Sequence, residues 1–166
     1  MILTTHALAG TLVASMIPNH PVLGFGLALA SHYALDMIPH WEYKMRTESE
    51  DLNVIHKISW RDNNTYLDIL TVKADALVGI LLSVGFLLLI GGFNWYTLAV
   101  GVIAGVLPDF LQFAHIIHSH RPFRWTQKIH DFFHADIKWK HRPVLGTLTQ
   151  VVSIIILIAV SSYLRK

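Results

Sequence analysis

The sequence predicts an all-α membrane protein, a polytopic helical bundle with about five transmembrane helices and further amphipathic helices at the membrane interface. Of its 166 residues, 53% are hydrophobic and 14% are charged, and the mean hydropathy is +0.46. Soluble domains carry about 25% charged residues, so this composition excludes an ordinary soluble domain. Apolar runs near the length that a bilayer core requires recur between polar connections. We therefore expect one membrane-embedded domain over residues 1–166.

Five segments are predicted to cross the membrane. They are Ile2–Ile17, Pro21–Ile38, Ala74–Gly92, Trp95–Ile117 and Val144–Leu164. A spanning helix needs about 20 apolar residues, so the first segment is short and implies a tightly packed or locally thinned span. Cysteine is absent, which excludes disulfides and thiolate ligands, and any metal must be held by histidines and carboxylates.

The distribution of Lys and Arg predicts the orientation of the segments. Basic residues are concentrated in the two long connections, 41–72 and 118–142, and are absent from the turns at 18–20 and 91–94. By the positive-inside rule, both long connections are cytoplasmic, which places a multi-pass protein in an inner membrane. Residues 41–72 are interpreted as a cytoplasmic insert, with a short amphipathic helix around Leu52–Ser59 lying against the membrane. Asp62-Asn63-Asn64 is interpreted as a turn or N-cap before a helix that runs into the third span.

The second connection is both basic and aromatic. Between Arg121 and Arg142 an apolar stripe runs along one side of a predicted helix; its members are Trp125, Ile129, Phe132, Phe133 and Ile137. Such a helix lies in the interface, buries its aromatic side chains among acyl chains and binds anionic headgroups with its cations. Membrane lipids are therefore the expected partners. Nucleic acid is not expected, because the basic stretch is aromatic and adjacent to the bilayer.

The stretch from Ser31 to His40 carries the clearest chemical signal. His32 and Asp36 are four residues apart and lie on one face of a helix, and Pro39 ends that helix beside His40. A carboxylate within a membrane segment costs roughly 2.5–3.5 kcal/mol unless it is compensated. Either a divalent metal bound by both groups or a buried Asp–His hydrogen bond that clamps helices would compensate it.

Similar residues recur at matching depth in other segments. His6 lies near the start of the first, Asp75 near the start of the third, and Asp109 follows Pro108, which is expected to break the fourth helix. His130 and His134 have the i,i+4 spacing of zinc-binding helices. The helix dipole alone would be a sufficient reason for an acid at Asp75, and clustered histidines are often merely solvated.

Because these residues fall near the cytoplasmic ends of their predicted helices, we expect one divalent metal site. The predicted metal ligands are His6, His32, Asp36, Asp109, His130 and His134, and the predicted catalytic residues are Asp75 and His40. Imidazole and carboxylate ligands without thiolate suit zinc, with manganese or iron as alternatives. The number of candidate ligands permits one ion or two.

At these residues the chain resembles the LexA-regulated, inner-membrane family of metal-dependent hydrolases. That family carries Gly/Thr-His, Leu-Pro-Asp, His-Arg-Gly-Phe-Thr-His and Ser-His-x-x-x-Asp elements. The similar pieces here are Thr5-His6, Leu107-Pro108-Asp109, His120-Arg121-Pro122-Phe123 and Ser31-His32-x-x-x-Asp36. Two features differ: the Ser-His-x-x-x-Asp element comes before Leu-Pro-Asp, and Arg124-Trp125 replaces Thr-His. A ligand expected at the latter must come from His130 or His134, or be missing.

The resemblance implies a hydrolase without naming its substrate. Together with the basic interfacial segment, it leads us to expect an integral membrane metal-dependent hydrolase that acts on a lipid or phosphoester. One alternative is a non-catalytic membrane subunit that uses His–Asp pairs as interhelical clamps. Another is a small transporter, which would need polar groups through the full membrane thickness.

Overall fold

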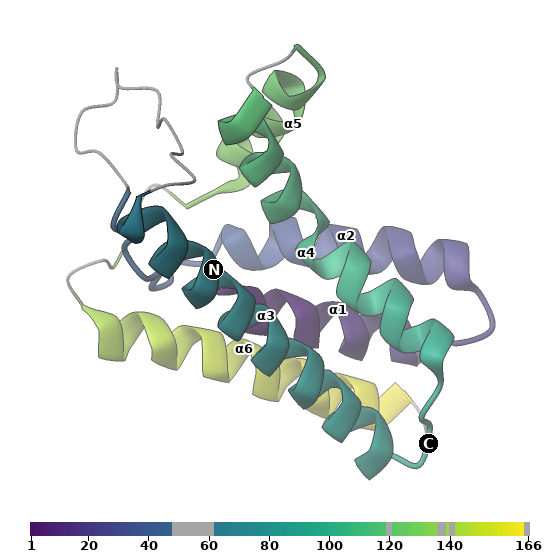
Figure 1. Cartoon of the computed structure of the whole chain (residues 1–166). Coiled ribbons are helices and arrows are strands. Elements are labelled where there is room, and N and C mark those ends of the chain that lie inside the picture. Colours follow the sequence, from purple (N-terminus) through teal and green to yellow (C-terminus); the bar gives the residue numbers. More distant parts are fainter. Residues whose placement is uncertain (48–61, 119–120, 136–138, 140–141, 165–166) are drawn as a thin grey trace.

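The computed structural model describes residues 1–47, 62–118, 121–135, 139 and 142–164, and these residues form six helices and no strand. The helices are α1 (Leu3–Met16), α2 (Pro21–Asp36), α3 (Asn63–Leu89), α4 (Trp95–His118), α5 (Arg121–Phe133) and α6 (Pro143–Leu164). Apart from α5, successive helices alternate in direction (Figure 1). The all-α helical bundle expected from the sequence is confirmed.

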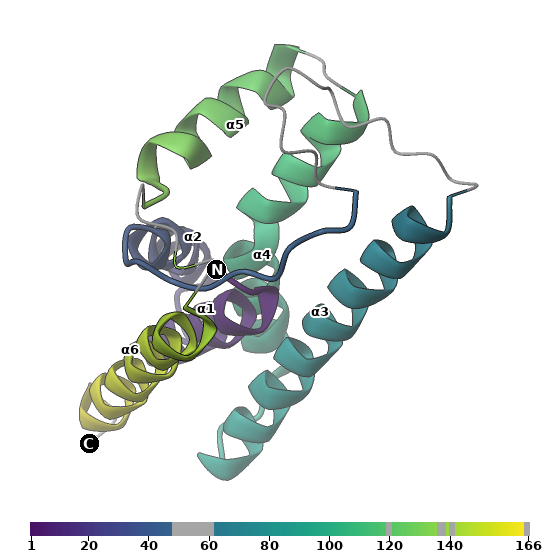
Figure 2. The same cartoon turned by 90° about the vertical axis from the view of Figure 1, so that its left-hand side faces the viewer.

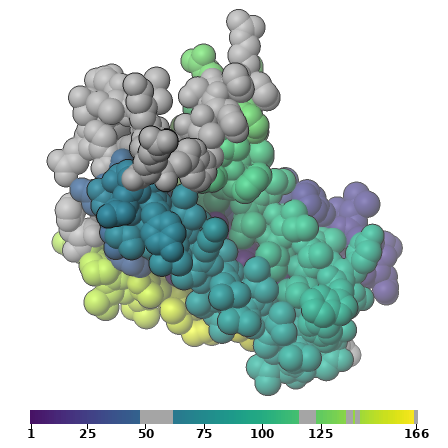
Figure 3. Space-filling model, in the orientation of Figure 1, coloured from purple at the N-terminus to yellow at the C-terminus, as the bar shows by residue number. Residues whose placement is uncertain are grey.

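Helix α1 is the centre of the bundle. It contacts α2, α3, α4 and α6, which surround it in the nearly end-on view of Figure 2. In the space-filling view, α3 and α4 cover almost all of α1 (Figure 3). Its buried residues are mainly small and lie on every side, as expected of a helix enclosed by protein rather than lipid.

Three helices, α3, α4 and α6, are long and apolar enough to cross a membrane, fewer than the five spans predicted from the sequence. With 14 and 16 residues, α1 and α2 are about 21 and about 24 Å long, short of the roughly 30 Å of a hydrocarbon core. Because α1 is enclosed by other helices, its length does not have to match the surrounding lipid.

Helix α3 begins at Asn63, at the turn or N-cap predicted for Asp62-Asn63-Asn64, and runs on into the apolar span predicted from Ala74. The side chain of Asp62 caps the helix by accepting a hydrogen bond from the Asn64 amide at 3.3 Å. Hydropathy identifies only the apolar part of a helix, so the polar first turns were assigned to the preceding insert. The amphipathic helix expected around Leu52–Ser59 lies outside the described residues.

Helix α4 runs through Pro108 without a break, contrary to the expectation of a helix broken at this proline. Proline removes a single backbone donor, and membrane helices tolerate that loss where neighbouring groups pair with the freed carbonyls. One turn before the proline, the Gly105 carbonyl accepts a hydrogen bond from the His32 ring at 2.7 Å. The proline therefore leaves the helix continuous and lies beside a carbonyl that binds a side chain of α2.

Glycines let α1 and α4 approach backbone to backbone. A Cβ atom on Gly10 would overlap the Gly101 carbonyl oxygen, and one on Gly101 would overlap the backbone of Thr11. Close approach of this kind is the usual reason for small residues at helix contacts in membranes. It fixes the depth of His6, one turn before Gly10, relative to α4.

We predict that Gly101→Ala lowers the thermal stability of the purified protein, because the added methyl group must push α1 and α4 apart. Overpacking of this kind costs about 1–3 kcal/mol. The matched control is Gly85→Ala in α3, where a Cβ meets nothing within 4 Å. The control should leave the melting temperature unchanged or raise it, because alanine favours helix more than glycine. Equal melting temperatures for the two variants would contradict the close contact.

Candidate metal centre

Four helices bring ionisable side chains together at one end of the bundle. The first turns of α1, which start beside the N label in Figure 1, meet the last turns of α2, the middle of α4 and the end of α5. The side chains that meet there are His6, His32, Asp36, Asp109 and His130. Five of the six ligands predicted from the sequence therefore lie in one cluster.

Within the cluster, donor atoms of His32, Asp36, Asp109 and His130 lie close enough to share one metal ion. Asp36 Oδ2 is 3.1 Å from His32 Nε2 and 3.2 Å from His130 Nε2. Asp109 Oδ1 is 3.4 Å from His130 Nε2 and 3.8 Å from His32 Nε2. With zinc bonds of about 2.0–2.1 Å, the edges of a tetrahedron are about 3.3 Å long, so these separations fit four ligands around one ion.

The hydrogen bonds of His32 fix which of its ring nitrogens is free. Its Nδ1 lies 2.7 Å from the Gly105 carbonyl oxygen, which can only accept, so Nδ1 carries the proton. In neutral His32, Nε2 therefore directs a lone pair at Asp36 Oδ2, another acceptor. Both atoms are buried and neither has a hydrogen-bond partner. A cation between them removes this conflict, as in metal sites where the second ring nitrogen of a ligand histidine is hydrogen-bonded.

The backbone adds negative potential to the same place. Asp36 is the last residue of α2, and His130 lies in the last turn of α5, so two helix C-termini face the cluster. Burial disfavours a charged His130, but the adjacent carboxylates of Asp109 and Asp36 raise its pKa to about 9. The cluster thus favours positive charge, whether it is supplied by a proton or by a metal ion.

His6 contacts the carboxylate but lies outside the four-residue group. Its Nε2 is 3.1 Å from Asp36 Oδ1, the oxygen that does not face His32. Its ring stacks on the ring of His32 with centroids 3.8 Å apart. In this structure His6 is placed to orient Asp36 and His32.

A second group lies beside the first and shares Asp36 with it. His40 and His134 offer donor atoms within 4.8 Å of an Asp36 oxygen and of each other. Both Nε2 atoms are 2.8 Å from Glu42 Oε1. Burial would raise the pKa of Glu42, but hydrogen bonds from His134 and His40 hold it well below its usual range.

Sequence reasoning missed Glu42 and assigned it to a solvated insert. The signal was its position two residues after His40, on the short segment that follows Pro39. Helix α6 holds that segment in place: Thr149 Oγ1 donates to the Pro39 carbonyl at 2.8 Å, and Gln150 Nε2 donates to the Trp41 carbonyl at 2.8 Å. Contacts of this kind between distant segments cannot be predicted from local sequence pattern.

Asp75 does not join either group. Its carboxylate accepts hydrogen bonds from the Leu3 amide at 2.7 Å, the Thr4 amide at 3.0 Å and the Thr4 hydroxyl at 2.6 Å. Because α3 begins at Asn63, Asp75 lies well inside that helix, and the dipole argument for its position was wrong. It caps the N-terminus of α1, where Ile2 supplies no side-chain cap.

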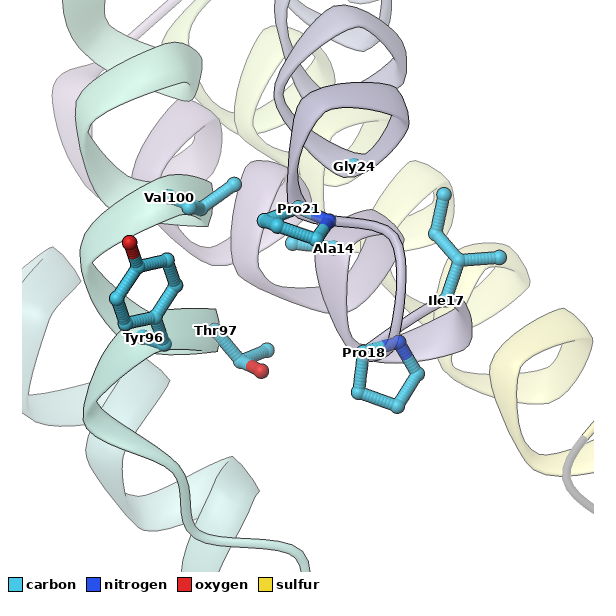
Figure 4. Close-up of a pocket in the computed structure, with 8 residues that line it drawn as sticks. All are labelled: Ala14, Ile17, Pro18, Pro21, Gly24, Tyr96, Thr97 and Val100. Atoms are coloured by element: carbon cyan, nitrogen blue, oxygen red, sulfur yellow. The ribbon is translucent and has the colours of Figure 1, made fainter.

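A pocket at the opposite end of α1, α2 and α4 lies away from these groups (Figure 4). Apolar residues such as Ile17 and Pro18 line most of it, and it contains no histidine or carboxylate.

Comparison of the chain with protein-family models, curated proteins and solved structures found no match. The interpretation of the chemistry therefore depends on the geometry of the two groups.

We predict that Asp75→Ala destabilises the protein without removing bound metal. Losing a helix cap costs about 1 kcal/mol, and Asp75 contributes no donor atom to either group. Thermal melting and the metal content of the purified variant measure the two effects separately. The control is Asp131→Ala, an exposed position on α5. Loss of metal at unchanged stability would instead support the catalytic role that the sequence suggested for Asp75.

Proposed function

We propose that the protein is an integral membrane metal-dependent hydrolase acting on a phosphoester of a lipid headgroup, with its site at the cytoplasmic face of an inner membrane. The observation that carries the proposal is the buried, unpartnered pair of His32 Nε2 and Asp36 Oδ2, 3.1 Å apart. A cation between two acceptors held face to face in this way would stabilise both, and His130 and Asp109 would complete its ligand set.

A divalent cation in this position supplies Lewis acidity and an activated water molecule for hydrolysis. The residues of the chain have separate tasks. His32, Asp36, Asp109 and His130 bind the ion, and the Gly105 carbonyl fixes the His32 tautomer. His6 positions Asp36 through the contact at Oδ1. In the net reaction, water adds to phosphorus, the ester P–O bond breaks, and the alcohol leaves with a proton.

The exposure of the side chains indicates from which side a substrate would approach. Asp36 and His32 are fully buried, whereas the side chains of Asp109 and Glu42 are 19% and 28% exposed. Access is therefore from the side of Asp109 and Glu42, where α5 and the segment after α2 meet. This side of the site lies next to the helix that carries the basic and aromatic residues.

Helix α5 links the site to a lipid surface. His130 points into the cluster, while Trp125 and Phe132, 71% and 82% exposed, are presented to the surroundings. Lys128 lies over the Trp125 ring at 5.7 Å, and Arg124 is exposed on the same helix. An exposed aromatic face with adjacent cations is suited to the headgroup region, where anionic lipids would be drawn toward this side of the site.

The test is hydrolysis of phosphoester lipids by the purified, metal-loaded protein in mixed micelles. We expect turnover that chelation abolishes and metal restores, and an Asp36→Asn variant with activity reduced about 100-fold or more, because amide oxygen is a far poorer ligand. The control Asp131→Asn changes an exposed α5 carboxylate that accepts a hydrogen bond from Gln127, and it should retain activity.

Two results would contradict the proposal. A protein that binds metal but hydrolyses no phosphoester would be a binding subunit rather than a hydrolase of this class. If the wild type holds no metal and the Asp36→Asn variant only melts at a lower temperature, the interhelical clamp would be supported. In the clamp, Asn still hydrogen-bonds His32, so the loss of stability would be only about 1 kcal/mol.

A further inference from the structure

We infer that the centre takes two divalent cations bridged by the carboxylate of Asp36, with His40, Glu42 and His134 as the remaining protein ligands of the second. This inference rests on the proposed function, whose ion is the one held by His32, Asp109 and His130. It assigns a role to Glu42, which the sequence pattern did not identify. It also makes His40, predicted to be catalytic, and His134, predicted to bind the first ion, ligands of the second ion.

The two oxygens of Asp36 face different neighbours, as a bridging carboxylate requires. Oδ2 lies 3.1 Å from His32 Nε2 and 3.2 Å from His130 Nε2, on the side of the first ion. Oδ1 lies 3.1 Å from His6 Nε2 and 2.8 Å from the Met1 amino nitrogen, which in turn is 3.2 Å from Glu42 Oε1. One carboxylate is thus shared between the two groups of candidate ligands.

In the second group, two histidines face one carboxylate oxygen at hydrogen-bond distance. His40 Nδ1 lies 2.7 Å from the Ile38 carbonyl oxygen, so that nitrogen carries the proton and donates it. Neutral His40 then directs the Nε2 lone pair at Glu42 Oε1, only 2.8 Å away. His134 Nε2 lies 2.8 Å from the same oxygen. A cation bound by all three side chains would remove this conflict between facing acceptors.

A positive group already lies in this place. The Met1 ammonium contacts both Asp36 Oδ1 and Glu42 Oε1, so the space between the two carboxylates stabilises a cation. The geometry is also held by the backbone, because the Ala135 amide donates to the Asp36 carbonyl at 2.8 Å. That hydrogen bond fixes His134, at the end of α5, beside the end of α2.

A dinuclear centre narrows the chemistry of the proposed hydrolase. Two ions sharing a carboxylate lie about 3.5–4 Å apart in enzymes that transfer or hydrolyse phosphoryl groups, where they bind oxygens on both sides of phosphorus. The second ion would lie on the exposed side, next to Glu42, where the substrate phosphate arrives. The ligand class predicted for this side is therefore a phosphate oxygen.

The experiment loads the full chain, purified in detergent, with Mn²⁺ and measures stoichiometry and electron paramagnetic resonance. Wild type should bind about two Mn²⁺ per chain and give the exchange-coupled spectrum of a carboxylate-bridged pair. Glu42→Gln and His134→Gln should each bind about one and give the six-line spectrum of isolated Mn²⁺. Both side chains are partly exposed, and retention of the first ion reports that each variant is folded. Asp131→Asn is the matched control and should behave as wild type.

The outcomes separate the two levels of the proposal. One isolated Mn²⁺ per wild-type chain would overturn the proposal of a second ion and would mean that the Met1 ammonium keeps that place. It would not contradict the proposed hydrolase. No Mn²⁺ at all would overturn both. Two ions that persist in Glu42→Gln, His134→Gln and His40→Gln would overturn the ligand assignment. Loss of both ions in all three variants would likewise overturn a separable second site.

Discussion

The burial of the Asp36 carboxylate is the constraint on which the rest of the structure depends. Asp36 is fully buried, at the negative C-terminal end of α2, in a chain rich in apolar helices. A charge in that position is unfavourable unless positive groups surround it. Three imidazoles, from α1, α2 and α5, and the Met1 ammonium contact its two oxygens. Their convergence brings together the ends of helices that are distant in sequence.

Packing elsewhere in the bundle serves this convergence. The glycine contact between α1 and α4 sets the depth of His6, and Asp75 of α3 caps the first turn of the same helix. Helix α6 has no acidic, lysine, arginine or histidine side chain among its described residues, yet Gln150 accepts from the Thr5 hydroxyl at 2.9 Å and donates to the Trp41 carbonyl. Each of these contacts fixes a backbone segment that carries a donor atom of the centre.

Much of the site could be predicted because its residues are rare in apolar segments. The i,i+4 pair of His32 and Asp36 stands out for that reason, and the structure brings His6, Asp109 and His130 to it. Glu42 was missed because acids are unremarkable in a polar connection, and only the turn after Pro39 brings it back to the cluster. Asp75 was misinterpreted because the start of the apolar span was taken as a helix N-terminus, although α3 begins at Asn63.

Helix lengths were predicted less well than helix identities. Apolar pattern indicated five spans, but α1 and α2 are shorter than a bilayer core. Helix α1 is surrounded by other helices and has no need to match lipid, whereas α2 exposes Val22 and Leu23. The predicted break at Pro108 was wrong because sequence pattern does not show which groups of neighbouring helices pair with the backbone of α4. Sequence pattern could not show that α2 packs against α4, or that His32 hydrogen-bonds the Gly105 carbonyl one turn before the proline.

The most direct test of the central claim is anomalous X-ray diffraction from crystals of the zinc-loaded protein, recorded on both sides of the zinc absorption edge. The account predicts an edge-dependent peak about 2.0–2.2 Å from His32 Nε2, His130 Nε2 and the oxygens of Asp36 and Asp109. Crystals grown with zinc that show no such peak, with His32 and Asp36 still in direct contact, would contradict it. In that case Asp36 would be neutralised by protein groups alone.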